Sequence, residues 1–299
     1  MAQISSFPAL MVRKVRLFIP LTKPRQLMLL MLSMYGAYFA GGGSLDLRSL
    51  ALLTIMGFAS IGGVTALNMY FDMDIDAIMR RTRKRPLPSK QLSPKEALAG
   101  SVFLIAVGAV TAYMINPYVL AAVLAGLFFD IVAYTQLTKR FTPLSIITGS
   151  IAGSMPALGG WLAATGQLSA GGILLALTVF LWQPMHVWFL AYYFKRDYDE
   201  AGIPVLPHND PRVLSMLVSI SIAAMPVVIW SFALAYGYGY LAALISTILA
   251  ALAIIRVRIF AETGDRRDAI SLFKFASPII AVVFILIPIE RNLVVTILA

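Results

Sequence analysis

Long apolar stretches separated by short polar segments run along almost the whole chain. Nine of them approach the ~20 residues that a helix needs to cross the hydrocarbon core of a membrane. The predicted spans are Gln26–Ala40, Leu50–Tyr70, Glu96–Ile115, Tyr118–Leu137, Pro143–Ala163, Gly171–Phe194, Val213–Tyr236, Tyr238–Ile255 and Leu272–Ile289. The first is short, and an earlier start near Phe18 would be bent by Pro20 and Pro24. No linker or low-complexity segment divides residues 1–299. The sequence therefore predicts an all-α membrane protein that forms a single nine-helix domain.

The amount and placement of charge agree with this prediction. Only 13% of the residues are charged, about half the share of a typical soluble domain. All but two of the 24 lysines and arginines lie before the first span or in every second connection; the exceptions are Arg48 and Arg291. Cytoplasmic loops carry the excess of lysine and arginine, so the N-terminus and segments 71–95 and 195–212 are predicted to be cytoplasmic, with the C-terminus outside the cell membrane. This placement of lysine and arginine in a protein surrounded by membrane lipid explains the net charge of +10, and no nucleic-acid partner is expected.

The segment after the second span carries charges that are costly beside a membrane. If it is helical, Asn68, Asp72 and Asp76 share one face at i, i+4 and i+8, whereas Asp74 points elsewhere. Amide and carboxylate oxygens suit Mg²⁺, which also binds substrate phosphates. The basic run 80–85 can bind phosphate oxygens directly. The sequence predicts a Mg²⁺–diphosphate site here, and the alternative is a solvated helix end with mixed charge.

A second polar segment follows the sixth span at the same predicted depth. Asp197 and Asp199 lie there beside Lys195. Two acidic clusters can each hold one Mg²⁺ on a shared diphosphate. The alternative is an ordinary interfacial loop in which Lys195 and Asp199 form an i,i+4 ion pair.

Residues in three further segments are candidates for substrate contact. His186 lies within the sixth span, where polar residues are often functional, although packing is an equal alternative. Asp130 lies within the fourth span with Tyr134 as its i+4 neighbour. Lys139 and Arg140 lie at the cytoplasmic rim, either as diphosphate contacts or as positive-inside anchors. The chain has no cysteine, which excludes thiolate catalysis.

Taken together, several segments resemble the UbiA superfamily of intramembrane prenyltransferases, in the form of its protoheme IX farnesyltransferase branch. They are Leu21-Thr22-Lys23-Pro24-Arg25, Asn68-x3-Asp72-x-Asp74-x-Asp76, Arg81 to Pro88, Tyr134-Thr135 through Lys139-Arg140-x-Thr142, Asp197-Tyr198 through Pro207, and Ala269-x3-Phe273 through Ser277. The resemblance covers about residues 20 to 290. One departure is that Ala201 stands where the superfamily's second motif has its second aspartate.

The resemblance implies a nine-helix bundle whose central cavity opens to the cytoplasm and to lipid. It implies Mg²⁺-dependent transfer of farnesyl from farnesyl diphosphate to a vinyl group of heme b, giving heme O, with a heme A synthase as the downstream partner. The implied metal and catalytic residues are Asn68, Asp72, Asp76 and Asp197. The implied substrate contacts are Arg83, Lys139, Arg140, Arg25, His186, Tyr134 and Lys195, with Arg25 near a heme propionate.

Two other functions remain compatible with the residues. One is a prenyltransferase of the same fold with a quinone-precursor or lipid acceptor. The other is a transporter that couples ions through Asp72, Asp76 and Asp130, which would place carboxylates at mid-depth on broken helices. Most acidic residues here lie at the predicted cytoplasmic rim, which favours the enzyme.

Overall fold

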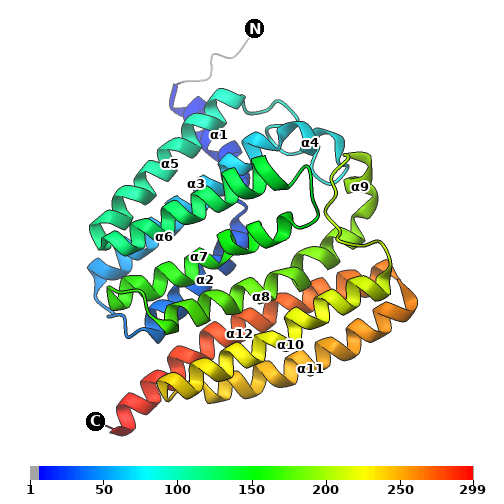
Figure 1. Ribbon diagram of the computed structural model, residues 1–299. Coiled ribbons are helices and arrows are strands. Elements are labelled where there is room, and N and C mark those ends of the chain that lie inside the picture. The colour runs from blue at the N-terminus through cyan, green and yellow to red at the C-terminus, as the bar shows by residue number, and fades with distance from the viewer. Residues whose placement is uncertain (1–6, 299) are drawn as a thin grey trace.

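The computed structural model describes residues 7–298, which form a bundle of long helices with no strand in that range (Figure 1). The elements are α1 (Phe7–Phe18), η1 (Ile19–Thr22), α2 (Pro24–Ala40), α3 (Leu47–Phe71), α4 (Met73–Ile78), α5 (Pro94–Ile115), α6 (Pro117–Leu127), η2 (Phe128–Thr138), α7 (Ser145–Thr165), α8 (Ala170–Tyr193), α9 (Lys195–Glu200), α10 (Pro211–Tyr236), α11 (Tyr240–Thr263) and α12 (Arg266–Leu298).

The prediction of many membrane-spanning helices is confirmed. Eight helices in the described range are long and apolar enough to cross a membrane, and they correspond to the second to ninth predicted spans. The first predicted span is α2, which has only 17 residues. The sequence placed a bend near Pro20 and Pro24, and there the structure has the 3-10 turn η1 followed by Lys23 in a left-handed conformation, φ 46°. The separate helix α1 was not predicted.

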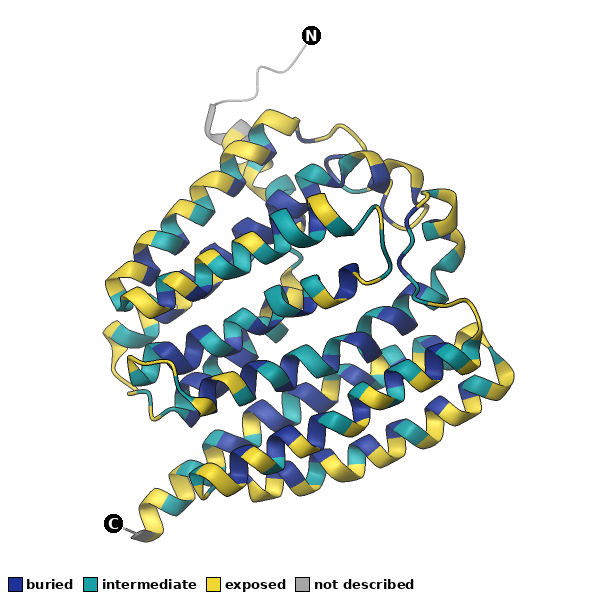
Figure 2. Cartoon of the chain, in the orientation of Figure 1, coloured by how far each residue is buried: buried dark blue, intermediate teal, exposed yellow. Residues whose placement is uncertain are grey.

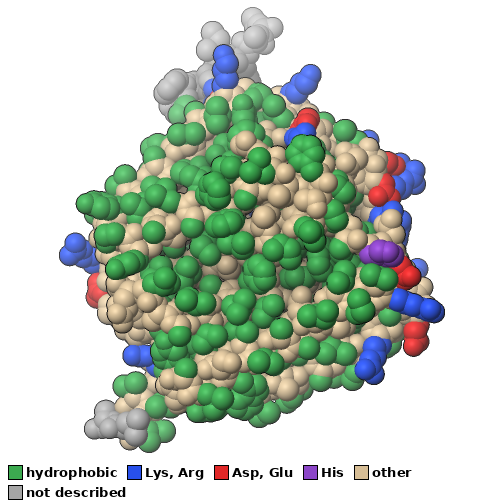
Figure 3. Space-filling view, in the orientation of Figure 1, with side chains coloured by type: hydrophobic (Ala, Val, Ile, Leu, Met, Phe, Trp, Pro, Cys, Tyr) green, Lys and Arg blue, Asp and Glu red, His purple; other side chains and the backbone are tan. Residues whose placement is uncertain are grey.

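The long helices pack side by side and leave an apolar outer surface. Helix α3 packs against α5, α7 lies between α2 and α8, and α12 joins α8 to α11. The outward helix faces are exposed and the inward faces buried (Figure 2). In the space-filling view, hydrophobic side chains cover most of the visible face and charged groups lie at its edges (Figure 3). Such a surface suits lipid rather than water, which agrees with a multi-pass membrane protein.

Both short polar helices lie at the same end of the bundle. Helix α4 follows α3, helix α9 follows α8, and both are found at the right-hand end of Figure 1. The two polar segments that the sequence singled out therefore meet in space. Chemistry carried by either one takes place at this end.

Glycine allows a close approach between α7 and α2. A Cβ added to Gly160 of α7 would overlap the carbonyl oxygen of Met34 on α2, whereas one added to Gly159 would lie 4.0 Å from its nearest neighbour, the Cβ of Ala122. Small residues at such crossings let membrane helices pack closely. The contact therefore depends on glycine at position 160 alone.

We expect Gly160→Ala to lower the stability of the protein by about 1–3 kcal/mol, since two backbones must move apart. Thermal unfolding in detergent would measure this as a lower midpoint. Gly159→Ala is the matched control and should leave the midpoint unchanged. Equal midpoints for the two variants would contradict the packing assignment.

Candidate active site

A cavity of about 1080 Å³ lies between α2, α3, η2, α7 and α8. This exceeds the volume of most small-molecule sites, which reach about 1,000 Å³, so it has room for more than one substrate. Its interior is lined by apolar side chains such as Leu29, Val64 and Val123. The charged residues that line it are Lys23, Arg25, Asp72, Asp76, Arg81, Arg85, Asp130 and Lys139. Cations outnumber carboxylates in this set, which favours an anionic ligand.

The predicted helical face is present at the charged end of the cavity. Helix α3 ends at Phe71, but the helical hydrogen bonds continue through the junction with α4. The amide of Asp72 donates to the carbonyl of Asn68 (3.0 Å), and that of Asp76 donates to the carbonyl of Asp72 (2.8 Å). All three side chains are buried and line the cavity. The i, i+4, i+8 spacing thus directs them to one side despite the break at Asp72.

Two of these carboxylates are neutralised by cations from other segments. Lys139 donates to Oδ2 of Asp72, and Arg85 donates to Oδ2 of Asp76 at 2.7 Å. Burial alone would lower the pKa of Lys139, but Asp72 helps to hold it above its ordinary value. Lys139 is therefore charged at neutral pH. It joins the end of η2 to the end of α3.

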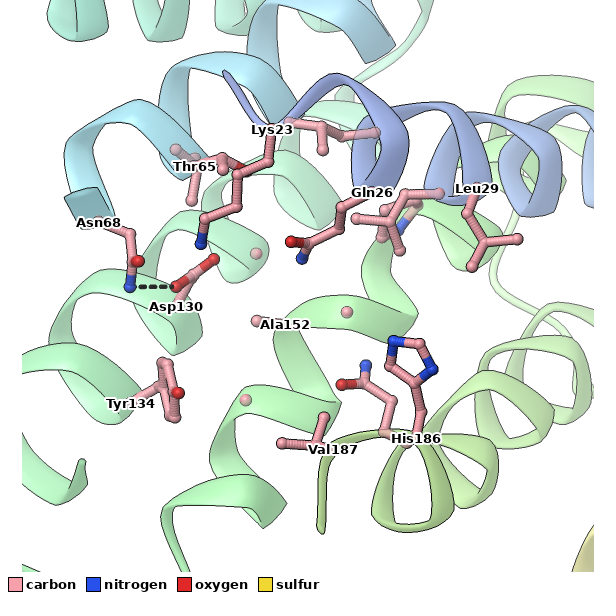
Figure 4. Close-up of a pocket in the computed structure, with 18 of the residues that line it drawn as sticks. Lys23, Gln26, Leu29, Thr65, Asn68, Asp130, Tyr134, Ala152, His186 and Val187 are labelled. Carbon is pink, nitrogen blue, oxygen red and sulfur yellow. Dashed lines mark hydrogen bonds between the residues drawn. The ribbon is translucent and has the colours of Figure 1, made fainter. Parts of the chain in front are cut away.

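Asn68 links this face to the fourth span. Its side-chain nitrogen donates to Oγ1 of Thr135 at 2.7 Å. The same nitrogen donates to Oδ1 of Asp130 at 3.4 Å (Figure 4). The amide oxygen takes no part in these two bonds. The pairing of Asp130 with Tyr134 expected from α-helical spacing is not formed in the structure, where Asp130 is bonded to Asn68 instead.

Asp130 and Tyr134 do not pair because the second half of the fourth span is a π-helix. Residues Phe128–Thr138 follow i→i+5 bonding, and the hydroxyl of Thr135 also donates to the carbonyl of Asp130 at 2.6 Å. π-helical turns are rare and occur mostly at functional sites. Here the wider turn brings Asp130, Thr135 and Lys139 toward the same cavity as Asn68.

Lys23 enters the cavity from the opposite wall. Its side chain points toward Asp130 and Asn68 (Figure 4). Burial lowers the pKa of Lys23 to about 8, and Arg85 and Lys139 act in the same direction. A bound anion would favour its charged form. The left-handed backbone at a non-glycine residue is strained, and such strain is typical of functional sites.

Asp197 is placed differently from the other predicted ligands. It is buried, but it does not line the cavity, and its Oδ2 accepts from the backbone amide of Arg81 at 3.1 Å. Within the described residues, no three carboxylates or histidines converge as a metal-binding group. Asp197 therefore positions the segment after α4, where the Arg81 guanidinium lies 4.9 Å from the Phe194 ring and reaches the cavity wall.

Three predicted substrate contacts lie outside the cavity wall. Arg83 is exposed. Arg140 makes a two-pronged ion pair with Asp74 at 2.8 and 2.9 Å, which holds the pKa of Asp74 below its usual range. Lys195 pairs with Asp199 at 2.6 Å, as the alternative interpretation of that loop predicted.

His186 forms an aromatic corner on the far side of the cavity. Its ring lies 4.4 Å from the centroids of both Trp182 and Phe273, and its Nδ1 is buried without a hydrogen-bond partner in the described part of the chain. The indole nitrogen of Trp182 donates to the carbonyl of Ala276 at 2.7 Å, which fixes this corner between α8 and α12. Tyr134 and Arg25 line the cavity as well. A flat aromatic group suits such a corner.

Three cations that line the cavity were not among the residues predicted from sequence. Lys23, Arg81 and Arg85 stand in segments whose resemblance was noted, yet none was chosen. The spacing of the basic run does not reveal which of its side chains turns inward. The bend expected near Pro20 and Pro24 could have singled out Lys23, which lies between the two prolines.

The residues present fit a magnesium ion. Oδ1 of Asp72 is buried and has no hydrogen-bond partner among residues 7–298, and the amide oxygen of Asn68 is not used in that residue's bonds to η2. Asp76 adds a second carboxylate on the same face. Mg²⁺ is usually held by one or two carboxylates together with substrate phosphates, so this donor set is sufficient.

Comparison with known proteins agrees with this geometry. The protoheme IX farnesyltransferase of Aeropyrum pernix is 69% identical over 286 residues, and the alignment covers 95% of this chain and 95% of that one. The protoheme IX farnesyltransferase of Hyperthermus butylicus is 41% identical, covering 91% of this chain and 93% of that one.

Solved structures share the fold. A UbiA homolog from Archaeoglobus fulgidus bound to GPP and Mg²⁺ aligns with a TM-score of 0.65 and 16% identity, over 91% of this chain and 99% of that one. The apo structure of a UbiA homolog from Aeropyrum pernix aligns with a TM-score of 0.65 and 21% identity, over 87% and 95%. A family model matches residues 29–278. The chain belongs to the UbiA prenyltransferase family.

Proposed function

We propose that this protein transfers farnesyl from farnesyl diphosphate to a vinyl group of heme b, giving heme O and diphosphate. The observation that carries the proposal is the Asn68–Asp72–Asp76 face at the charged end of an apolar cavity. This end, called the mouth below, is also lined by Lys23, Arg25, Arg81, Arg85 and Lys139. The names of the two relatives support the donor and the acceptor. The structural neighbour solved with GPP and Mg²⁺ is in line with a prenyl diphosphate bound through a metal.

The metal-binding residues in this proposal are Asn68, Asp72 and Asp76. Bound Mg²⁺ supplies Lewis-acid stabilisation of the diphosphate leaving group. Asp197 acts indirectly, because its bond to the Arg81 amide holds the segment that carries Arg81 and Arg85.

The charged side chains of the mouth bind the diphosphate and receive its developing charge. As the bond between C1 and oxygen breaks, the electron pair leaves with the diphosphate, and Lys23, Arg85 and Lys139 stabilise the added negative charge. Such preorganised charges act strongly where little water screens them. The apolar walls hold the isoprenoid chain and keep water from the allylic cation.

The acceptor occupies the aromatic corner of the cavity. The vinyl group of heme b attacks the allylic cation and forms the new carbon–carbon bond. A water molecule then adds to the resulting cation and loses a proton, which leaves the hydroxyl group. His186, between Trp182 and Phe273, contacts the tetrapyrrole face, and Arg25 at the mouth is available to a propionate.

In this proposal the charged mouth lies on the cytoplasmic side of the cell membrane. The connections around α4 and α9 carry many of the lysines and arginines, and cytoplasmic loops are enriched in these residues. Heme O would pass to a downstream heme A synthase.

Purified protein in lipid vesicles, given farnesyl diphosphate, heme b and Mg²⁺, is expected to form heme O, which mass spectrometry would detect. Chelation by EDTA should abolish the product and added Mg²⁺ should restore it. If the product is a prenylated quinone precursor or lipid rather than heme O, heme b is not the acceptor. Product formation that is indifferent to EDTA would remove the metal from the proposal.

A further inference from the structure

The end of the cavity opposite the charged mouth is closed by two methionines. We infer that Met34 and Met56 set the longest prenyl chain that the protein accepts, and that the limit lies at farnesyl. The inference rests on the proposed function and names the donor's chain-length class.

The order of the lining residues along each helix locates this closed end, which we call the floor of the cavity. Helix α2 lines the cavity as far as Met34, α3 as far as Met56, α6 as far as Ala122 and α7 as far as Gly159. Met34 and Met56 are only 1% and 3% exposed. Beyond them lies a buried apolar cluster that closes the bundle, comprising Tyr38, Leu53, Val119 and Leu162 among others.

The depth of the cavity matches one chain length. Asn68 and Met56 are twelve residues apart on α3, which corresponds to about 18 Å of helix. An extended chain gains about 1.2 Å per covalent bond, so a farnesyl chain reaches about 14 Å and a geranylgeranyl chain about 19 Å. Because the methionine side chains occupy part of the 18 Å, farnesyl fits extended and geranylgeranyl does not.

The position of Met34 depends on a glycine of the facing helix. A Cβ added to Gly57 would lie 2.6 Å from Cε and 2.9 Å from the sulfur of Met34. The backbone of α2 cannot move back, because the carbonyl of Met34 already contacts Gly160 of α7. A methyl group at position 57 would therefore push the tip of Met34 into the cavity and shorten it.

Two substitutions should shift chain-length preference in opposite directions. Met34→Ala is expected to raise the preference for geranylgeranyl over farnesyl diphosphate by about 10-fold or more, as expected when a pocket gains several carbons of space. Gly57→Ala is expected to shift preference toward geranyl diphosphate by about 10-fold. Met31→Ala is the matched control, because Met31 is buried on the same helix but does not line the cavity, and its preference should equal that of the unchanged protein.

Preference is measured in two ways: by kcat/KM for heme products of each chain length, and by competition binding of the three prenyl diphosphates with Mg²⁺ and no acceptor. The binding measurement separates the two proposals, since it tests the floor even if heme is not the acceptor. Opposite shifts in Met34→Ala and Gly57→Ala support the inference. If folded Met34→Ala binds the three diphosphates in the same ratios as Met31→Ala, or if the unchanged protein accepts geranylgeranyl as well as farnesyl, the floor does not set the limit.

Discussion

Replacing Asp72 with asparagine is expected to reduce prenyl transfer by about 10²–10³-fold, the loss that follows removal of one preorganised electrostatic group. The buried carboxylate pairs with Lys139 through one oxygen, and its other oxygen has no partner within the part of the chain that the structure describes. Asparagine preserves the shape of the side chain but removes the charge that a divalent cation requires. Product formation by mass spectrometry, measured against Mg²⁺ concentration, would show a lower rate and a higher demand for metal.

Asp74 provides the matched control in the same segment. It is 60% exposed, pairs with Arg140 and does not line the cavity. Because an exposed ion pair contributes at most about 1 kcal/mol, Asp74→Asn should stay within about 5-fold of the unchanged protein. Similar losses in the two variants, or full activity in Asp72→Asn, would remove Asp72 from the metal site.

Replacing Lys139 with methionine is expected to lower both activity and stability. The Lys139 side chain is 16% exposed and its ammonium group bonds Asp72, so its loss leaves a buried carboxylate unpaired, at a cost of about 3–5 kcal/mol. The same change removes a cation that stabilises the leaving diphosphate, for which we expect about a 10²-fold slower reaction. Thermal unfolding in detergent and the rate of product formation measure the two effects separately.

A double variant distinguishes a catalytic role of Lys139 from a purely structural one. Asp72→Asn combined with Lys139→Met removes both charges, so the unfolding midpoint should return toward that of the unchanged protein. If Lys139 also stabilises the leaving diphosphate, the activity of the double variant should fall below that of Asp72→Asn alone. Arg140→Met, at the adjacent but outward-facing position, should change the rate only slightly. A double variant that is no slower than Asp72→Asn alone would show that Lys139 serves only to hold Asp72.

The membrane fold and the shared face of Asn68, Asp72 and Asp76 were both accessible from sequence. Hydropathy and the one-sided placement of cations are properties of chain segments, and a bilayer imposes a fixed length on each span. Helical spacing likewise follows from backbone geometry, so Asn68, Asp72 and Asp76 could be assigned to one face from their positions in the chain. The short first span, predicted at Gln26–Ala40, agrees with α2, whereas the separate helix α1 was not predicted.

Pairings between distant segments could not be predicted, because they depend on how the helices are rotated against one another. Asp130 bonds Asn68 rather than Tyr134, since a π-helix changes which residues share a face. Arg85 turns inward whereas Arg83 is exposed, although both belong to one basic run.

The sequence by itself determined that the chain crosses a membrane many times and carries hard oxygen ligands and cations at one rim. Only the tertiary structure decided which cations face those ligands and where the cavity ends. It also decided that Asp197 bonds the segment after α4 and does not line the cavity. The physical reason is that spacing along one helix is set by local bonds, whereas the depth and lining of a cavity are set by contacts such as Gly57 with Met34 between helices.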